Sequence, residues 1–151
     1  MPAIGNSFIE KKSPFWVALR AIILLLGLMQ SATFMRSMNG DFSKPSWSFP
    51  FVMAALVALG ILFIFFIQTV NPRSISKWYR PSWFRNPFNY KQPLQIFDFA
   101  AFYFLSVGFG CLFFGLTRDP TSWVWELPIA IGCGAWLGVR LCVLVFADRF
   151  E

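Results

Sequence analysis

Four long apolar stretches, separated by short polar connections, divide this chain of 151 residues. They cover residues 14–34, 49–70, 94–116 and 123–147, and each is long enough to cross a hydrocarbon core of roughly 30 Å as a helix. Apolar residues run through them continuously, whereas a transmembrane strand alternates polar and apolar positions. A helix also satisfies its backbone hydrogen bonds internally, as lipid requires. The pattern predicts an all-α integral membrane protein, a single domain of four transmembrane helices over residues 1–151.

Composition agrees with lipid as the solvent of this chain. Hydrophobic residues make up 57% of it and charged residues only 13%, about half of the fraction usual in soluble domains. Histidine is absent, and the three cysteines are far apart without CxxC spacing. We therefore expect no enzyme activity, no metal site and no cofactor. A net charge of +6 is explained better by a membrane surface than by nucleic acid, because the cations cluster between apolar stretches.

The distribution of cations predicts the orientation. The N-terminal lead, the connection over residues 71–93 and the C-terminal end together carry eight cations, and the other two connections carry three. The eight are Lys11, Lys12, Arg73, Lys77, Arg80, Arg85, Lys91 and Arg149, against Arg36, Lys44 and Arg118. Because cytoplasmic segments carry the excess of Lys and Arg, both termini and residues 71–93 should be cytoplasmic. We expect a multi-pass protein of a bacterial-type inner membrane.

The connection over residues 71–93 is both basic and aromatic. Over residues 72–80, apolar and cationic positions fall on opposite faces of a helix. This arrangement predicts a short interfacial amphipathic helix between the second and third transmembrane helices. The connection is either a topology anchor or a surface that binds anionic lipid headgroups or a cytoplasmic partner. The residues of that candidate surface are Arg73, Lys77, Trp78, Arg80, Trp83, Arg85 and Lys91.

Three charged residues lie inside the predicted spans: Arg20, Asp98 and Arg140. All three fall in the predicted cytoplasmic half of the bilayer, where a charge is costly unless it is paired or reaches the interface. Arg140 leans toward the bilayer centre, because side chains tilt toward the N-terminus of their helix. We therefore expect an Asp98–Arg140 pair with Arg20 nearby. A structural pair, an ion or proton pathway, and a headgroup site are the alternatives.

Small residues recur at four-residue spacing in the last two spans. Gly134 and Gly138 form a GxxxG motif, and Ser106 and Gly110 form a related pair, both of which allow close approach between helices. A short connection makes these two spans an antiparallel hairpin, so packing inside the chain is expected, with a homo-oligomeric face as the alternative. The sequence SVGFG at 106–110 is similar to the potassium-channel filter sequence TVGYG. Helix packing explains the same residues better, because the apolar run is unbroken there.

These features favour a non-enzymatic membrane protein that acts by protein–protein interaction. It would be an accessory subunit of a membrane complex or an immunity-like protective protein, with anionic lipid around it and a membrane-protein partner or a second copy bound. The alternative is a small oligomeric transporter or channel that uses Arg20, Asp98 and Arg140. A lipid-modifying enzyme is the third choice, because Asp98 and Glu126 lie at opposite depths and so cannot act as a catalytic pair.

Overall fold

The computed structural model describes residues 11–37, 46–71, 78–118 and 124–150. Its elements are α1 (Pro14–Ser37), α2 (Phe49–Val70), α3 (Pro93–Arg118), α4 (Glu126–Val145) and the short 3-10 helix η1 (Ala147–Arg149). Each of the four α-helices is long and apolar enough to cross a membrane. The predicted all-α fold, with four helices long and apolar enough to span a membrane, is thereby confirmed for the described residues. Their ends differ by a few residues, since α1 continues to Ser37 and α4 begins only at Glu126.

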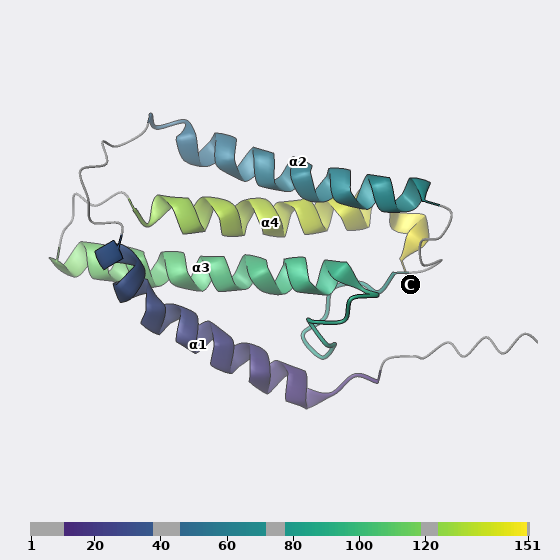
Figure 1. The fold of residues 1–151 in the computed structure, drawn as a ribbon, viewed down its shortest axis with the longest axis horizontal. Helices are drawn as coiled ribbons and strands as arrows, with labels where there is room; N and C mark the ends of the chain where they lie inside the picture. Colours follow the sequence, from purple (N-terminus) through teal and green to yellow (C-terminus); the bar gives the residue numbers. More distant parts are fainter. Residues whose placement is uncertain (1–10, 38–45, 72–77, 119–123, 151) are drawn as a thin grey trace, which may run out of the picture.

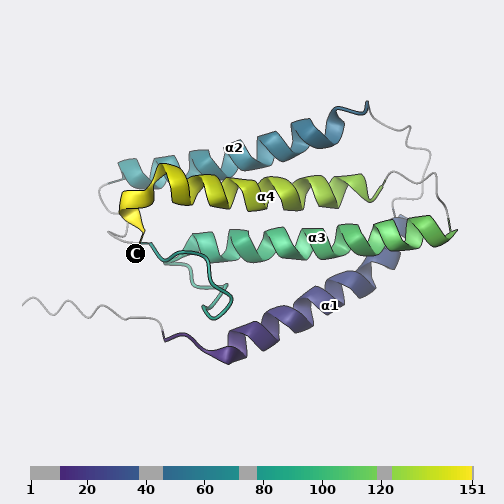
Figure 2. The same ribbon diagram turned by 180° about the vertical axis from the view of Figure 1, so that it is seen from behind.

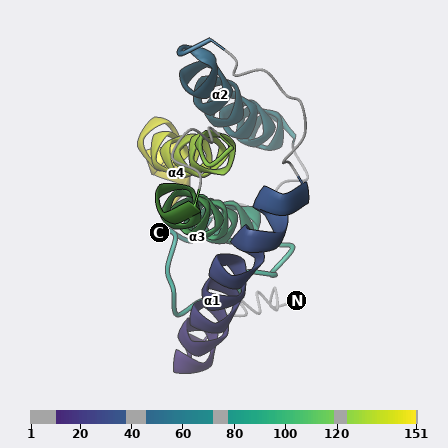
Figure 3. The same cartoon turned by 90° about the vertical axis from the view of Figure 1, so that its left-hand side faces the viewer.

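The helices form a row in the order α2, α4, α3, α1 (Figure 1). Among the described residues, α2 packs on α4, α4 on α3, and α3 on α1, so α1 and α2 stand at opposite edges although they are consecutive in sequence. The end-on view in Figure 3 shows the same order. The start of α1, residues 78–92 and the C-terminal η1 gather at one end of the row (Figures 1 and 2).

Burial is concentrated in the two central helices. Within their apolar windows, 39% of the α3 positions and 44% of the α4 positions are buried, against 17% in each of α1 and α2. The edge helices therefore present most of their apolar side chains outward. In a soluble protein such large exposed apolar surfaces would promote aggregation, whereas in a bilayer the acyl chains solvate them. The exposed side chains of α2, such as Phe51, Leu59 and Phe63, are suited to lipid.

The GxxxG motif of α4 faces α2. Gly134 lies against the backbone of Ala54, and a Cβ added at Gly138 would lie 3.0 Å from the Cα of Ala58. Ala54 and Ala58 have the same four-residue spacing, so both helices present small residues and their backbones approach closely. The hairpin expected from the sequence would pair these glycines with α3. The structure instead gives them α2, which runs parallel to α4.

The second motif has the same construction on the other side of the row. Gly110 lies against Ser31 of α1, and a Cβ added at Gly27 would lie 2.6 Å from the Oγ of Ser106. Gly27 and Ser31 repeat the four-residue spacing, and α1 runs parallel to α3. Residues 106–110 are helical throughout, as expected for packing rather than for an ion filter.

A third seam joins α3 to α4 in the antiparallel sense. Gly108 lies against Ile129, and a Cβ added at Gly132 would lie 2.9 Å from the carbonyl oxygen of Ala101. The glycines that hold the hairpin together are therefore different from those of the two sequence motifs. Three seams of small residues, one for each helix pair, fix the order of the row.

The described part of the predicted interfacial helix is not helical. Residues 72–77 lie outside the described residues, and Trp78 forms an isolated parallel bridge with Phe150 instead of a helical turn. Tyr79 and Arg80 have no regular structure. The prediction is therefore wrong for residues 78–80, because the backbone there pairs with the C-terminal end of the chain, a contact that amphipathic periodicity cannot reveal.

Candidate functional site

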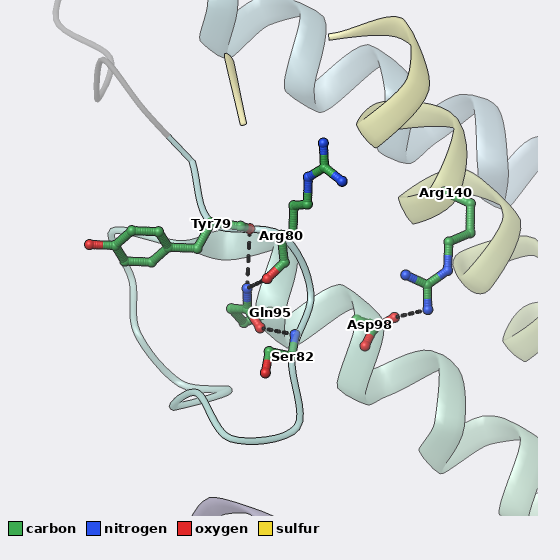
Figure 4. Close-up of polar contacts among 6 residues, drawn as sticks. All are labelled: Tyr79, Arg80, Ser82, Gln95, Asp98 and Arg140. Carbon is green, nitrogen blue, oxygen red and sulfur yellow. Dashed lines mark hydrogen bonds and ion pairs between the residues drawn. The ribbon is translucent and has the colours of Figure 1, made fainter. Parts of the chain in front are cut away.

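Residues 78–92, which we call the cap loop, are held at one end of the row by two glutamines, Gln92 at the end of the loop itself and Gln95 in the first turn of α3. The Gln95 side chain donates from Nε2 to the carbonyl oxygens of Tyr79 (3.2 Å) and Arg80 (3.0 Å), and its Oε1 accepts from the Ser82 amide at 3.1 Å (Figure 4). Oε1 of Gln92 accepts from the Tyr79 amide at 2.8 Å. Both glutamines are buried. Sequence reasoning missed them; the available signal was a pair of amides, three residues apart, opening an apolar helix.

Trp78 anchors the beginning of the cap loop in the protein core. Its side chain is only 2% exposed, and its ring packs edge-on against Phe65 with 5.0 Å between centroids and tilted against Phe150 at 5.6 Å. Its amide donates to the Arg149 carbonyl oxygen at 2.8 Å. The sequence assigned Trp78 to an exposed surface that meets lipid or a partner. The structure corrects this, because α2 and the C-terminal segment surround the ring.

Arg20 ties α1 to the cap loop. Its side chain is 1% exposed, its Nη2 donates to the carbonyl oxygen of Arg85 at 2.9 Å, and its guanidinium carbon lies 5.9 Å from the centre of the Phe99 ring. Nearby, the Ser13 amide donates to the Phe84 carbonyl oxygen at 2.9 Å. A guanidinium so enclosed works as a structural connector between two segments.

The structure contains the expected ion pair between α3 and α4. Arg140 Nη2 lies 3.4 Å from Asp98 Oδ1 (Figure 4), a long contact for a charge-assisted hydrogen bond. The two partners are buried to very different degrees, since the Asp98 side chain is 2% exposed and that of Arg140 is 39% exposed. The guanidinium of Arg140 also lies 5.4 Å from the Trp136 ring centre. Asp98 thus faces the inside of the row, while Arg140 reaches its surface.

Two further residues of the candidate surface are partly used inside the protein. Trp83 packs edge-on against Phe102 of α3 with 5.4 Å between ring centroids. The guanidinium of Arg85 lies 3.9 Å from the centre of the Tyr79 ring, a close cation–π contact. Both side chains are half-buried, and they stabilise the shape of the cap loop.

The remaining cations of that surface differ in what the structure describes. Arg80 and Lys91 are exposed. Arg73 and Lys77 lie outside the described residues. A basic surface for anionic headgroups thus retains Arg80 and Lys91 within the described part of the cap loop. Its two tryptophans are buried or half-buried, whereas other aromatic side chains of the cap loop are exposed, namely Phe84, Phe88 and Tyr90.

Two mainly apolar cavities lie away from Arg20, Asp98 and Arg140. One of about 260 Å³ is lined by residues of α1, α3 and α4, among them Gln30 and Tyr103, whose hydroxyl donates to Gln30 Oε1 at 2.6 Å. The other, of about 380 Å³, separates the first turns of α2 and α4 and is lined by Phe51, Glu126 and Cys133, among others. Within the described ranges, no three His, Cys, Asp or Glu side chains gather as metal ligands would.

Comparison with protein-family models, curated proteins and solved structures found no match for this chain.

Proposed function

We propose that this chain is a non-enzymatic membrane protein that acts by binding another membrane protein. It would serve as an accessory subunit of a membrane complex or as a protective protein. The observation that carries this proposal is the open row of helices. α1 and α2 cover only the outer edges of the central pair, so α3 and α4 keep large exposed side chains such as Phe109, Trp136 and Leu137. Open helix faces of this kind suit the addition of further helices.

The polar groups at the cap-loop end favour a structural use over catalysis. Gln92 and Gln95 direct their amides to backbone groups of the cap loop, and Arg20 does the same with the Arg85 carbonyl oxygen. Each of these side chains forms a part-buried hydrogen bond with a backbone atom that would otherwise be costly to leave unsatisfied. We therefore assign this end of the molecule to rigid support of the helix row.

We further propose that the protein resides in a bacterial-type inner membrane with both termini and the cap loop in the cytoplasm. The support is the excess of Lys and Arg on the N-terminal segment, residues 71–93 and the C-terminal segment over the other two connections. A cysteine introduced by Asp148→Cys should react with a membrane-impermeant maleimide only after the cells are opened. Labelling of intact cells would contradict this orientation.

The interaction is tested by purifying the tagged chain from its native membranes in a mild detergent. We expect one heterologous membrane protein to co-purify in a constant ratio, and a tagged membrane protein of similar size and unrelated sequence serves as the control. Repeated recovery of the chain as an isolated monomer would contradict the proposal.

The alternative, a small oligomeric transporter, rests on Arg20, Asp98 and Arg140 lying in one half of the row. It predicts ion or proton flux into liposomes that disappears with Asp98→Asn. The two cavities described above are lined mainly by apolar side chains and lie elsewhere, so we rank transport below interaction.

A further inference from the structure

We propose that one exposed stripe of α4 is the docking surface for a transmembrane helix of another protein, and that this partner helix carries an Asp or Glu at the depth of Arg140. The α4 stripe consists of Cys133, Trp136, Leu137, Arg140 and Leu144. This inference rests on the proposed function and names the surface and the chemistry of the partner.

The α4 stripe is a continuous line along the helix. Its members are spaced by three or four residues, which places them on one face of an α-helix. Trp136 is 42%, Leu137 44% and Leu144 72% exposed. The residues between them, such as Ala135 and Val139, are buried in the contacts with the neighbouring helices. The stripe is thus a face of α4 that the described residues of the chain leave partly or largely uncovered.

Arg140 provides the α4 stripe with hydrogen-bond donors that can bind an external acceptor. A guanidinium has five N–H donors, and within the described residues that of Arg140 has one hydrogen-bond acceptor, Asp98 Oδ1 at 3.4 Å. Its side chain is 39% exposed although it lies inside a membrane-spanning helix. A charge inside a membrane-spanning segment is costly unless it is paired or reaches the interface. An acidic group supplied from outside the chain would supply the acceptor and the opposite charge together.

Depth favours a carboxylate on a helix over a lipid phosphate. Arg140 stands five residues before the end of α4, which corresponds to about 8 Å along the axis. Its guanidinium is held toward Trp136, one turn deeper. A phosphate would have to leave the headgroup layer to reach it. A side chain on a neighbouring transmembrane helix can lie at that depth by its position in the sequence alone.

A second copy of this chain fits the α4 stripe poorly. Two copies with the same orientation, related by a two-fold axis, would place Arg140 of one against Arg140 of the other, and like charges at one depth repel. The acid nearest to that depth, Asp98, is 2% exposed and already contacts Arg140 within its own chain. The charge on the stripe therefore selects a different protein.

An apolar cavity adjoins the α4 stripe at the end away from Arg140. Cys133 also lines the cavity of about 380 Å³ between the first turns of α2 and α4, together with Phe51, Ala54 and Ile129. Ile129, which also packs against Gly108 of α3, lies four residues before Cys133, at the edge of the stripe. An apolar cleft at one end and a cation near the other define a surface long enough for a helix.

The test uses a photo-crosslinking amino acid in place of Leu137, in the full chain and in native membranes, with the same amino acid in place of Phe63 as the control. Phe63 is 62% exposed on α2, outside the stripe. We expect a crosslinked membrane protein at position 137 with an Asp or Glu inside a span, and none in comparable yield at position 63. Arg140→Gln should lower the yield about tenfold or more, whereas Arg140→Lys should retain most of it. Neutralising the partner's acid should cause the same loss.

A second variant shows whether a loss of crosslinking results from misfolding. Arg140→Gln leaves Asp98 without its partner, so Asp98→Asn/Arg140→Gln, which removes both charges, is measured alongside for its resistance to denaturant. A folded double variant that crosslinks as well as the unaltered chain overturns the inference. So does a product consisting only of lipid or of a second copy of the chain. A stable partner that crosslinks only at other positions overturns the α4 stripe but leaves the proposed function in place, whereas the absence of any partner removes both.

Discussion

Two arginines occupy the same half of the helix row, yet the regions around them differ. Around Arg20, α1, α3 and the cap loop close over the guanidinium, which is 1% exposed and bonded to a backbone carbonyl oxygen. Around Arg140, Asp98 of α3 is the only acceptor among the described residues, and 39% of the Arg140 side chain is exposed. In the sequence both are single cations about two turns from the end of an apolar stretch. Arg20 binds two segments of the chain together, whereas Arg140 contacts Asp98 and keeps part of its side chain exposed.

The difference shows what decides the use of a charge inside a membrane-spanning segment. A cation that meets a local acceptor and is enclosed becomes part of the packing, and its removal should unfold that region. A cation that stays partly exposed retains capacity for an external partner, and its removal should affect binding more than folding. The following predictions measure stability as the free energy of unfolding, from the loss of helicity as sodium dodecyl sulfate is added to the protein in mild detergent.

The largest effect is expected for Trp78→Ala, which removes the anchor of the cap loop that encloses Arg20. The ring is 2% exposed, so its truncation leaves a large cavity and should lower the free energy of unfolding by about 3–5 kcal/mol. Trp47→Ala is the control, because Trp47 is 81% exposed, and it should change stability by less than about 1 kcal/mol. Similar losses for both would mean that the cap loop does not stabilise the row.

Arg20→Ala tests the enclosed side of the comparison directly. It removes a buried side chain and leaves the Arg85 carbonyl oxygen without this donor, so we expect a loss of about 2–4 kcal/mol. The matched variant is Asp98→Asn/Arg140→Gln, which removes the other arginine together with its counter-charge and should cost about 1 kcal/mol or less. An equal loss in the two variants would erase the distinction between the two arginines.

Gln95→Leu should have an intermediate effect on the cap loop. The substitution keeps the volume and apolar packing but deprives Tyr79, Arg80 and Ser82 of their buried partner, at a cost of about 1–3 kcal/mol. Gln68→Leu on α2 is the control, since no hydrogen bond among the described residues engages its side chain, and it should be close to neutral. If Gln95→Leu were equally neutral, the cap loop would hold its shape without α3.

The smallest effect is expected for the coupling between Asp98 and Arg140 in the isolated chain. At 3.4 Å and with one partner 39% exposed, the interaction should contribute about 0.5–1 kcal/mol. A double-mutant cycle with Arg140→Ala, Asp98→Ala and both together measures it. Strictly additive losses would mean that the two charges do not interact. A coupling well above this range would indicate that Arg140 is satisfied within the chain, which would weaken the case for an external acid.

The sequence located the helices well because a span is recognised from local composition alone. About twenty apolar residues in a row satisfy the bilayer whatever the rest of the chain does. The depth of Asp98 and Arg140 followed from the same count, which is why their pairing could be expected. Trp78 shows the limit. Its place among alternating aromatic and basic residues is typical of an interface, but a bridge to Phe150, more than seventy residues away, draws it into the core.

By itself, the sequence determined four helices long and apolar enough to cross a membrane, the segments that carry most of the cations, and the small-residue motifs that allow close packing. Only the tertiary structure decided that Gly134 and Gly138 meet α2, that Ser106 and Gly110 meet α1, and that Arg20 is enclosed while Arg140 is not. The physical reason is that hydropathy depends on a segment and its solvent, whereas these contacts depend on how each helix is rotated and which neighbours the order of the row provides.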